Sequence, residues 1–169
     1  MRRQTQDVCL PFESTMWITR KTDYATRAVL ALAIAEDGDK PVKLAELAER
    51  TAVPAPFLEQ IMSQLRGAGI VRSERGPAGG YRLNHPASQI SLDRVVRVFQ
   101  GQLAPIACAT RHSPEPCPMD VACSLREVWQ EVRDATIAIL DNVDFATLAR
   151  RAGGRWVTPL ELLPPLAGR

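Results

Sequence analysis

The residues best suited to chemistry in this chain are three cysteines in one short segment. Cys108, Cys117 and Cys123 are separated by eight and five residues, and three prolines interrupt the backbone between the first and the last of them. Three thiols cannot all pair as disulfides, and an irregular backbone leaves them free to converge on one point. Thiolates hold soft metal centres. The segment therefore predicts an iron-sulfur or zinc site whose fourth ligand comes from elsewhere.

The composition is that of an ordinary folded protein. The chain has 169 residues, 46% of them hydrophobic, and a formal net charge of +2, which is too small to identify a partner. No apolar run approaches the roughly 20 residues of a membrane span, and the first fifteen residues lack the apolar core of a signal peptide. We therefore expect a cytoplasmic protein with no membrane contact. In that reducing compartment, clustered cysteines are expected to be metal ligands or redox sensors rather than disulfides.

Two short helices are expected ahead of the cysteines. Residues 43–50 and 57–66 each carry an apolar stripe, and a break containing two prolines separates them. This pattern is typical of a helix-turn-helix, whose second helix enters the major groove of DNA. The buried face of the second helix should contain Phe57 or Leu58 together with Ile61, Met62 and Leu65. Its DNA-facing residues should be Glu59, Gln60 and Ser63.

A β-hairpin is expected directly after these helices. Residues 70–75 and 81–83 have the pattern of strands, and the turn between them contains three glycines. A hairpin in this position is the wing of a winged helix. Arg75 lies at its tip, where it could enter a minor groove. Arg72 and Arg82 are candidates for contacts with DNA phosphates, which position a protein without reading sequence.

Further helices are expected at 19–35, at 91–99 with Ser91 as N-cap, and from Cys123 to about residue 142. The last is long and amphipathic, and a second copy of the chain would cover its apolar seam most economically. The expected fold class is mainly α, a winged helix-turn-helix with a small β-hairpin wing and a long dimerisation helix. The expected divisions are a flexible extension (1–15), the winged helix-turn-helix domain (16–103), a cysteine-rich loop (104–122), the dimerisation helix with a terminal helical turn (123–152) and a loose tail (153–169).

Several stretches resemble one known family, the winged-helix iron-sulfur regulators typified by IscR, NsrR and RirA. The likeness covers about 16–152 and rests on TRKTDYA at 19–25, FLEQI at 57–61, VRSERGPAGGYRL at 71–83, ISLDRVV at 90–96 and the three cysteines. It implies a homodimer that regulates transcription, as a repressor, by binding promoter DNA. It also implies a 4Fe-4S or 2Fe-2S cluster on the cysteines that senses nitric oxide, iron or redox state.

The fourth cluster ligand is where members of this family differ. Proteins similar to IscR use a histidine three residues after the last cysteine, where this chain has Arg126. Proteins similar to NsrR offer an aspartate early in the first helix, and Asp23 occupies that place when counted from Met16. His112, inside the cysteine loop, is the rival ligand. The resemblance also makes Glu59 similar to a glutamate of IscR that could accept a hydrogen bond from a cytosine amino group.

Two alternatives remain open at this point. One is a winged-helix regulator switched by zinc or by thiol oxidation. The other is an iron-sulfur redox protein. Against an enzyme of any kind, the sequence contains no nucleotide-binding loop and no acid-base constellation.

Overall fold

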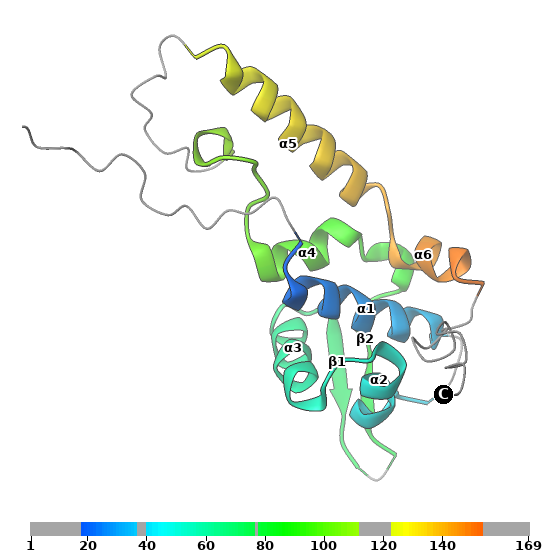
Figure 1. The fold of residues 1–169 in the computed structure, drawn as a ribbon. Helices are drawn as coiled ribbons and strands as arrows, with labels where there is room; N and C mark the ends of the chain where they lie inside the picture. The colour runs from blue at the N-terminus through cyan, green and yellow to red at the C-terminus, as the bar shows by residue number, and fades with distance from the viewer. Residues whose placement is uncertain (1–17, 37–39, 77, 112–122, 154–169) are drawn as a thin grey trace, which may run out of the picture. The chain divides into compact units, whose positions relative to one another are not determined.

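The computed structural model describes residues 18–36, 40–76, 78–111 and 123–153. Contacts divide these residues into two compact units, one made of 18–101 and 138–153 and the other of 102–111 and 123–137. Figure 1 gives the order of the elements along the chain. The described part is mainly helical with one antiparallel hairpin, so the predicted fold class is confirmed.

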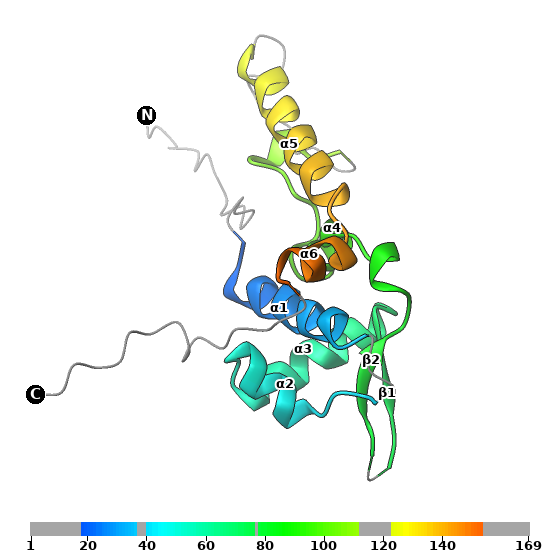
Figure 2. The ribbon, with the colours of Figure 1, turned by 90° about the vertical axis from the view of Figure 1, so that its right-hand side faces the viewer.

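Helix α1 (Arg20–Ile34) is the centre of the first unit. Its N-cap is Thr19, whose hydroxyl accepts a hydrogen bond from the Thr22 N–H at 3.2 Å. Its buried face is rich in alanine, which allows close approach of neighbouring helices. α1 packs against α2 (Leu44–Thr51), α3 (Ala55–Gly67), α4 (Leu92–Gln100) and α6 (Phe145–Arg151). Figures 1 and 2 show α1 between α2 and α3 on one side and α4 and α6 on the other.

Helices α2 and α3 form the predicted helix-turn-helix. α2 is followed by its C-cap Ala52, whose φ of 53° reverses the chain. The Pro54 carbonyl accepts from the N–H groups of Phe57 and Leu58 at 3.0 Å. α3 begins two residues earlier than expected because Pro56 is tolerated in a first turn. Its buried residues are Leu58, Ile61, Met62 and Leu65, which is the predicted face with Leu58 in place of Phe57.

The wing consists of β1 (Val71–Glu74) and β2 (Gly80–Leu83), and it projects beyond the helices in both views (Figures 1 and 2). Val42 extends the sheet by one bridge, since it exchanges two backbone hydrogen bonds of 3.0 and 2.8 Å with Tyr81. This close approach requires a glycine at position 80, because a Cβ there would lie 2.4 Å from the Val42 carbonyl oxygen.

The C-terminal elements close the core of the first unit. Ser91 caps α4 as predicted, accepting from the Arg94 N–H at 3.3 Å. The Phe145 N–H donates to the Ile90 carbonyl at 3.0 Å, and the Phe145 side chain is fully buried at the start of α6. The short helical segment expected beyond residue 142 is thus α6, and it belongs to the core beside α1.

The second unit contains a 3-10 turn, η2 (Ala107–Ala109), and most of α5 (Leu125–Asp141). The helix is continuous and passes into the first unit at residue 138. None of the helices in the described ranges combines the length and apolarity that crossing a bilayer requires.

Candidate functional site

The outward face of α3 carries the residues expected to meet DNA. Glu59, Gln60 and Ser63 are all exposed, opposite the buried face of the helix. Phe57 joins them, since 60% of it is exposed in the first turn, one helical step from Gln60. The N-terminal part of a recognition helix is where base edges are contacted. The face therefore offers an acid, an amide, a hydroxyl and an aromatic ring.

The wing carries three exposed or half-exposed arginines, and two of them share one carboxylate. Arg72 and Arg82 lie opposite each other in the hairpin register. Glu74 pairs with both, at 3.1 Å from the Arg82 Nε and 3.8 Å from the Arg72 Nε. Ion pairs this exposed contribute only about 0 to 1 kcal/mol, so a DNA phosphate can compete for the arginines. Arg75 is exposed next to the turn and has no ion pair within the described residues.

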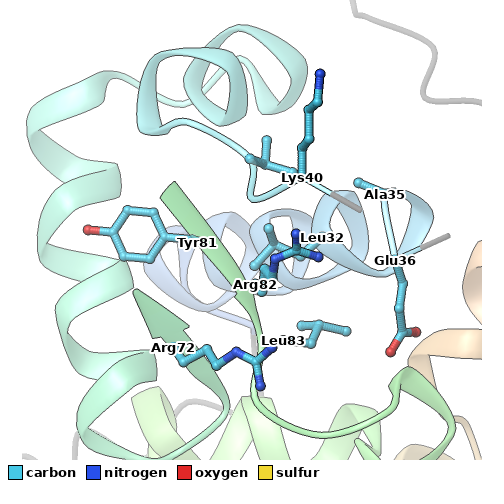
Figure 3. Close-up of a pocket in the computed structure, with 9 residues that line it drawn as sticks. Leu32, Ala35, Glu36, Lys40, Arg72, Tyr81, Arg82 and Leu83 are labelled. Carbon is cyan, nitrogen blue, oxygen red and sulfur yellow. The ribbon is translucent and has the colours of Figure 1, made fainter. Parts of the chain in front are cut away.

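A cavity of about 120 Å³ lies between the end of α1, residues 40–42 and the wing (Figure 3). Its walls combine apolar side chains such as Leu32 and Leu83 with Lys40, Arg72 and Arg82. No sulfur atom is among its lining groups, and the Glu36 carboxylate on its rim accepts from the Ala87 N–H at 3.1 and 3.2 Å. None of the candidate metal ligands in the described part of the chain is among the residues that line this cavity.

The structure describes two of the three candidate cysteine ligands. Cys108 lies in the middle of η2, and Cys123 lies two residues before α5. Both thiols are free and partly exposed. Cys117 and His112 lie outside the described residues, and no group of three metal-binding side chains occurs within them. The donor chemistry fits a thiophilic cluster, because neither described thiol is consumed by a disulfide.

A charged network attaches the Cys108 turn to α5. Arg133, only 8% exposed, donates from Nη1 to the Ala109 carbonyl and from Nε and Nη2 to the Asp134 carboxylate at 2.9 Å. Arg111 donates to the same carboxylate at 2.6 and 3.2 Å. These hydrogen bonds, Arg133 first and Arg111 second, lower the pKa of Asp134 to about 2.

Asp23 belongs to the first unit, in the first turn of α1. Its carboxylate is paired with Arg27, one helical turn further on, with bond lengths of 3.1 and 2.6 Å. The side chain remains 40% exposed. One lone pair of each oxygen is thus still available to another partner.

The comparison with known protein families decides what kind of protein this is. Residues 18–151 match the model of Rrf2, described as an iron-dependent transcriptional regulator. This chain belongs to the Rrf2 family. Rrf2 proteins are transcriptional regulators, so the chain is a DNA-binding regulator and not an enzyme, as the sequence predicted.

Three relatives illustrate the range of the Rrf2 family. The chain is 35% identical over 135 residues to the transcriptional regulator IscR of Photobacterium profundum, covering 80% of this chain and 76% of the relative. It is 31% identical over 139 residues to the transcriptional repressor NsrR of Streptomyces coelicolor, covering 82% and 92%. The solved structure of CymR, the global cysteine regulator of B. subtilis, has a TM-score of 0.66 at 30% identity and covers 80% and 97%.

Two residues of this Rrf2 protein have surroundings that the sequence did not predict. The apolar stripe of the second helix predicts only a core role for Phe57, whereas the neighbouring Leu58 is the residue that is buried. The contact of Arg133 with the Cys108 turn was not predicted, because Arg133 and Ala109 are 24 residues apart in sequence. A signal existed, since Arg133 lies four residues after Trp129 and three before Thr136, on a face expected to be apolar.

Proposed function

We propose that this Rrf2 protein is a cytoplasmic transcriptional repressor that binds promoter DNA as a homodimer under the control of an iron-sulfur cluster. The observation that carries the proposal is the pair of free, partly exposed thiols, Cys108 and Cys123, on either side of the segment that contains Cys117. The family model that matches this chain describes an iron-dependent regulator, which supports iron over other thiophilic metals at these thiols.

The proposed cluster ligands are Cys108, Cys117 and Cys123, with Asp23 as the fourth ligand ahead of His112. A 4Fe-4S or 2Fe-2S cluster would make the protein sensitive to nitric oxide, oxidants or iron shortage, because each of these conditions removes or alters the iron and sulfide of the cluster. Asp23 can serve because its pairing with Arg27 is exposed and therefore weak, at about 0 to 1 kcal/mol. An oxygen ligand from α1 would connect the cysteine segment to the DNA-binding unit.

The proposed DNA contacts come from α3 and the wing. Glu59 can accept from a cytosine amino group, Gln60 and Ser63 offer both donors and acceptors, and the ring of Phe57 suits a thymine methyl group. Arg75 is placed for the minor groove, whereas Arg72 and Arg82 suit phosphates. Base contacts of this kind each discriminate by about 1 to 3 kcal/mol.

The proposed dimer contact is the apolar seam of α5. Leu125, Val128 and Ile139 are 59%, 49% and 67% exposed, which is unusual for large apolar side chains. With Val132 and Ala135 they repeat at alternating spacings of three and four residues, the pattern of a coiled-coil seam. A second copy of the same helix supplies a matching surface.

The direct test is chemical analysis of protein purified without oxygen. We expect iron and acid-labile sulfide together with visible absorption, and we expect all three to be lost when Cys108, Cys117 or Cys123 is replaced by Ala. Colourless protein without iron and sulfide would rule out the cluster.

A second candidate is a thiol- or zinc-switched regulator, and the partial exposure of the free Cys108 and Cys123 thiols favours it. In that case the protein would be colourless, and either zinc removal or a thiol oxidant would change its affinity for promoter DNA.

A further inference from the structure

Arg133 is a buried cation in an otherwise accessible helix. Along α5, which the structure describes in full, it is the single buried residue. A guanidinium withdrawn from water needs acceptors nearby, because an unpaired buried charge is costly. The acceptors of Arg133 come from two different segments of its unit, the turn at Ala109 and α5 itself at Asp134.

The first acceptor is the carbonyl of Ala109, in the same three-residue turn as Cys108. The bond fixes the backbone one residue beyond the thiol. The second acceptor is Asp134, which also receives Arg111 at 2.6 Å. Residues 107–111 are thus attached to α5 at two points, by Arg133 at Ala109 and by Asp134 at Arg111.

We propose that Arg133 is a positioning residue for Cys108, and that its bond to Ala109 transmits changes at the cysteines to α5. The inference rests on the proposed cluster function. Groups that orient a metal ligand without touching the metal typically change metal affinity about 10- to 100-fold when removed. Arg133 occupies that relation to Cys108.

The position of Arg133 on α5 suits a transmitting role. Arg133 follows Trp129 by one helical turn, whereas the exposed seam of Leu125, Val128 and Ile139 lies on another face. One continuous helix therefore carries the attachment of the Cys108 turn on one face and the proposed partner surface on another.

The test compares anaerobically purified full-length protein with its Arg133→Met variant and a matched control, Glu131→Gln, an exposed acid on the same helix. The first readout is the rate at which a chelator bleaches the visible absorption. We expect Arg133→Met to bleach about 10- to 100-fold faster and Glu131→Gln to match the parent. The second readout is the ratio of promoter affinities with and without the cluster, which should collapse toward one in Arg133→Met.

The melting temperatures of the cluster-free proteins show whether each variant still folds, and two milder variants serve as further controls. Arg133→Lys keeps a donor for the Ala109 carbonyl, so its cluster should bleach more slowly than that of Arg133→Met. The bleaching rate of Asp134→Asn should fall between those of the parent and Arg133→Met. If the parent holds a cluster and Arg133→Met bleaches at the parent rate with an unchanged affinity ratio, the inference is wrong while the cluster function stands. If the parent holds no cluster, the proposed function itself fails.

Discussion

Arg27 contacts the carboxylate of Asp23 through two bonds on α1, Nε to Oδ1 at 3.1 Å and Nη2 to Oδ2 at 2.6 Å. The pair is about 40% exposed on both sides, so it stabilises the helix by only a few tenths of a kcal/mol to 1 kcal/mol. An iron-ligand bond is far stronger than this pairing. The carboxylate is therefore held in a defined rotamer and remains available as a ligand.

The first prediction concerns the fourth ligand. Asp23→Ala should alter the visible absorption of the anaerobic protein and speed its loss in air, because one iron would lose its oxygen ligand. His112→Ala should leave both unchanged. The measurement is the absorption spectrum followed over time in each variant. A bleached His112→Ala protein beside an unchanged Asp23→Ala protein would reverse the assignment.

The second prediction concerns the close approach between the wing and residue 42. Gly80→Ala should destabilise the protein by roughly 1 to 3 kcal/mol, because the new Cβ would lie 2.4 Å from the Val42 carbonyl oxygen, a backbone atom that cannot rotate away as a flexible side chain could. Gly67→Ala is the matched control. No atom lies within 4 Å of its Cβ, at the end of α3, so the change should be neutral or stabilise by about 0.4 to 1 kcal/mol. The measurement is urea unfolding of both variants. Equal free energies of unfolding for Gly80→Ala and Gly67→Ala would contradict the close packing at position 80.

The third prediction concerns Phe57. If its exposed ring packs on a thymine methyl group, replacing that thymine by uracil should weaken binding by about 0.8 kcal/mol, roughly fourfold. The Phe57→Ala variant should bind the two probes equally. Fluorescence anisotropy on probes with uracil introduced at one thymine at a time provides the measurement. The proposed contact between Phe57 and a thymine methyl group is absent if no thymine-to-uracil replacement weakens binding of the parent protein more than binding of Phe57→Ala.

The fourth prediction concerns the wing. Arg75→Ala should cost about 1 to 3 kcal/mol of promoter affinity, since Arg75 has no ion pair within the described residues and lies next to the turn. Arg72→Ala should cost less, because Arg72 already shares Glu74 with Arg82. Affinities measured at several salt concentrations separate a base contact from a phosphate contact. A larger loss for Arg72→Ala would contradict the assignment.

Local signals predicted the elements of the fold well. Ser91 marks the start of α4 by its hydroxyl, and the glycine-rich turn marks the wing, because both effects act over a few residues. Phe57 and Leu58 could not be separated, since adjacent residues in a first turn both suit a core and tertiary packing selects one. This ambiguity has a functional consequence, because the residue left outside joins the proposed DNA surface.

Long-range relationships could not be predicted. The pairing of Glu74 with two arginines depends on the hairpin register, and the bond from Arg133 to Ala109 joins residues 24 positions apart. The choice of Asp23 or His112 as the proposed fourth ligand also depends on tertiary structure, because it depends on which side chain the folded protein brings to the cysteines. The sequence indicates candidate ligands and leaves their geometry open.

In the proposed function, the cysteine segment controls promoter binding through a cluster. This coupling is tested by measuring promoter affinity on one anaerobic sample before and after the cluster is removed, with protein concentration and salt held constant. We expect promoter affinity to change by about tenfold or more, equivalent to about 1.4 kcal/mol of coupling, and we expect no such change in a variant with Cys108, Cys117 and Cys123 replaced by Ala. Equal affinities in the two states of the parent protein would contradict it.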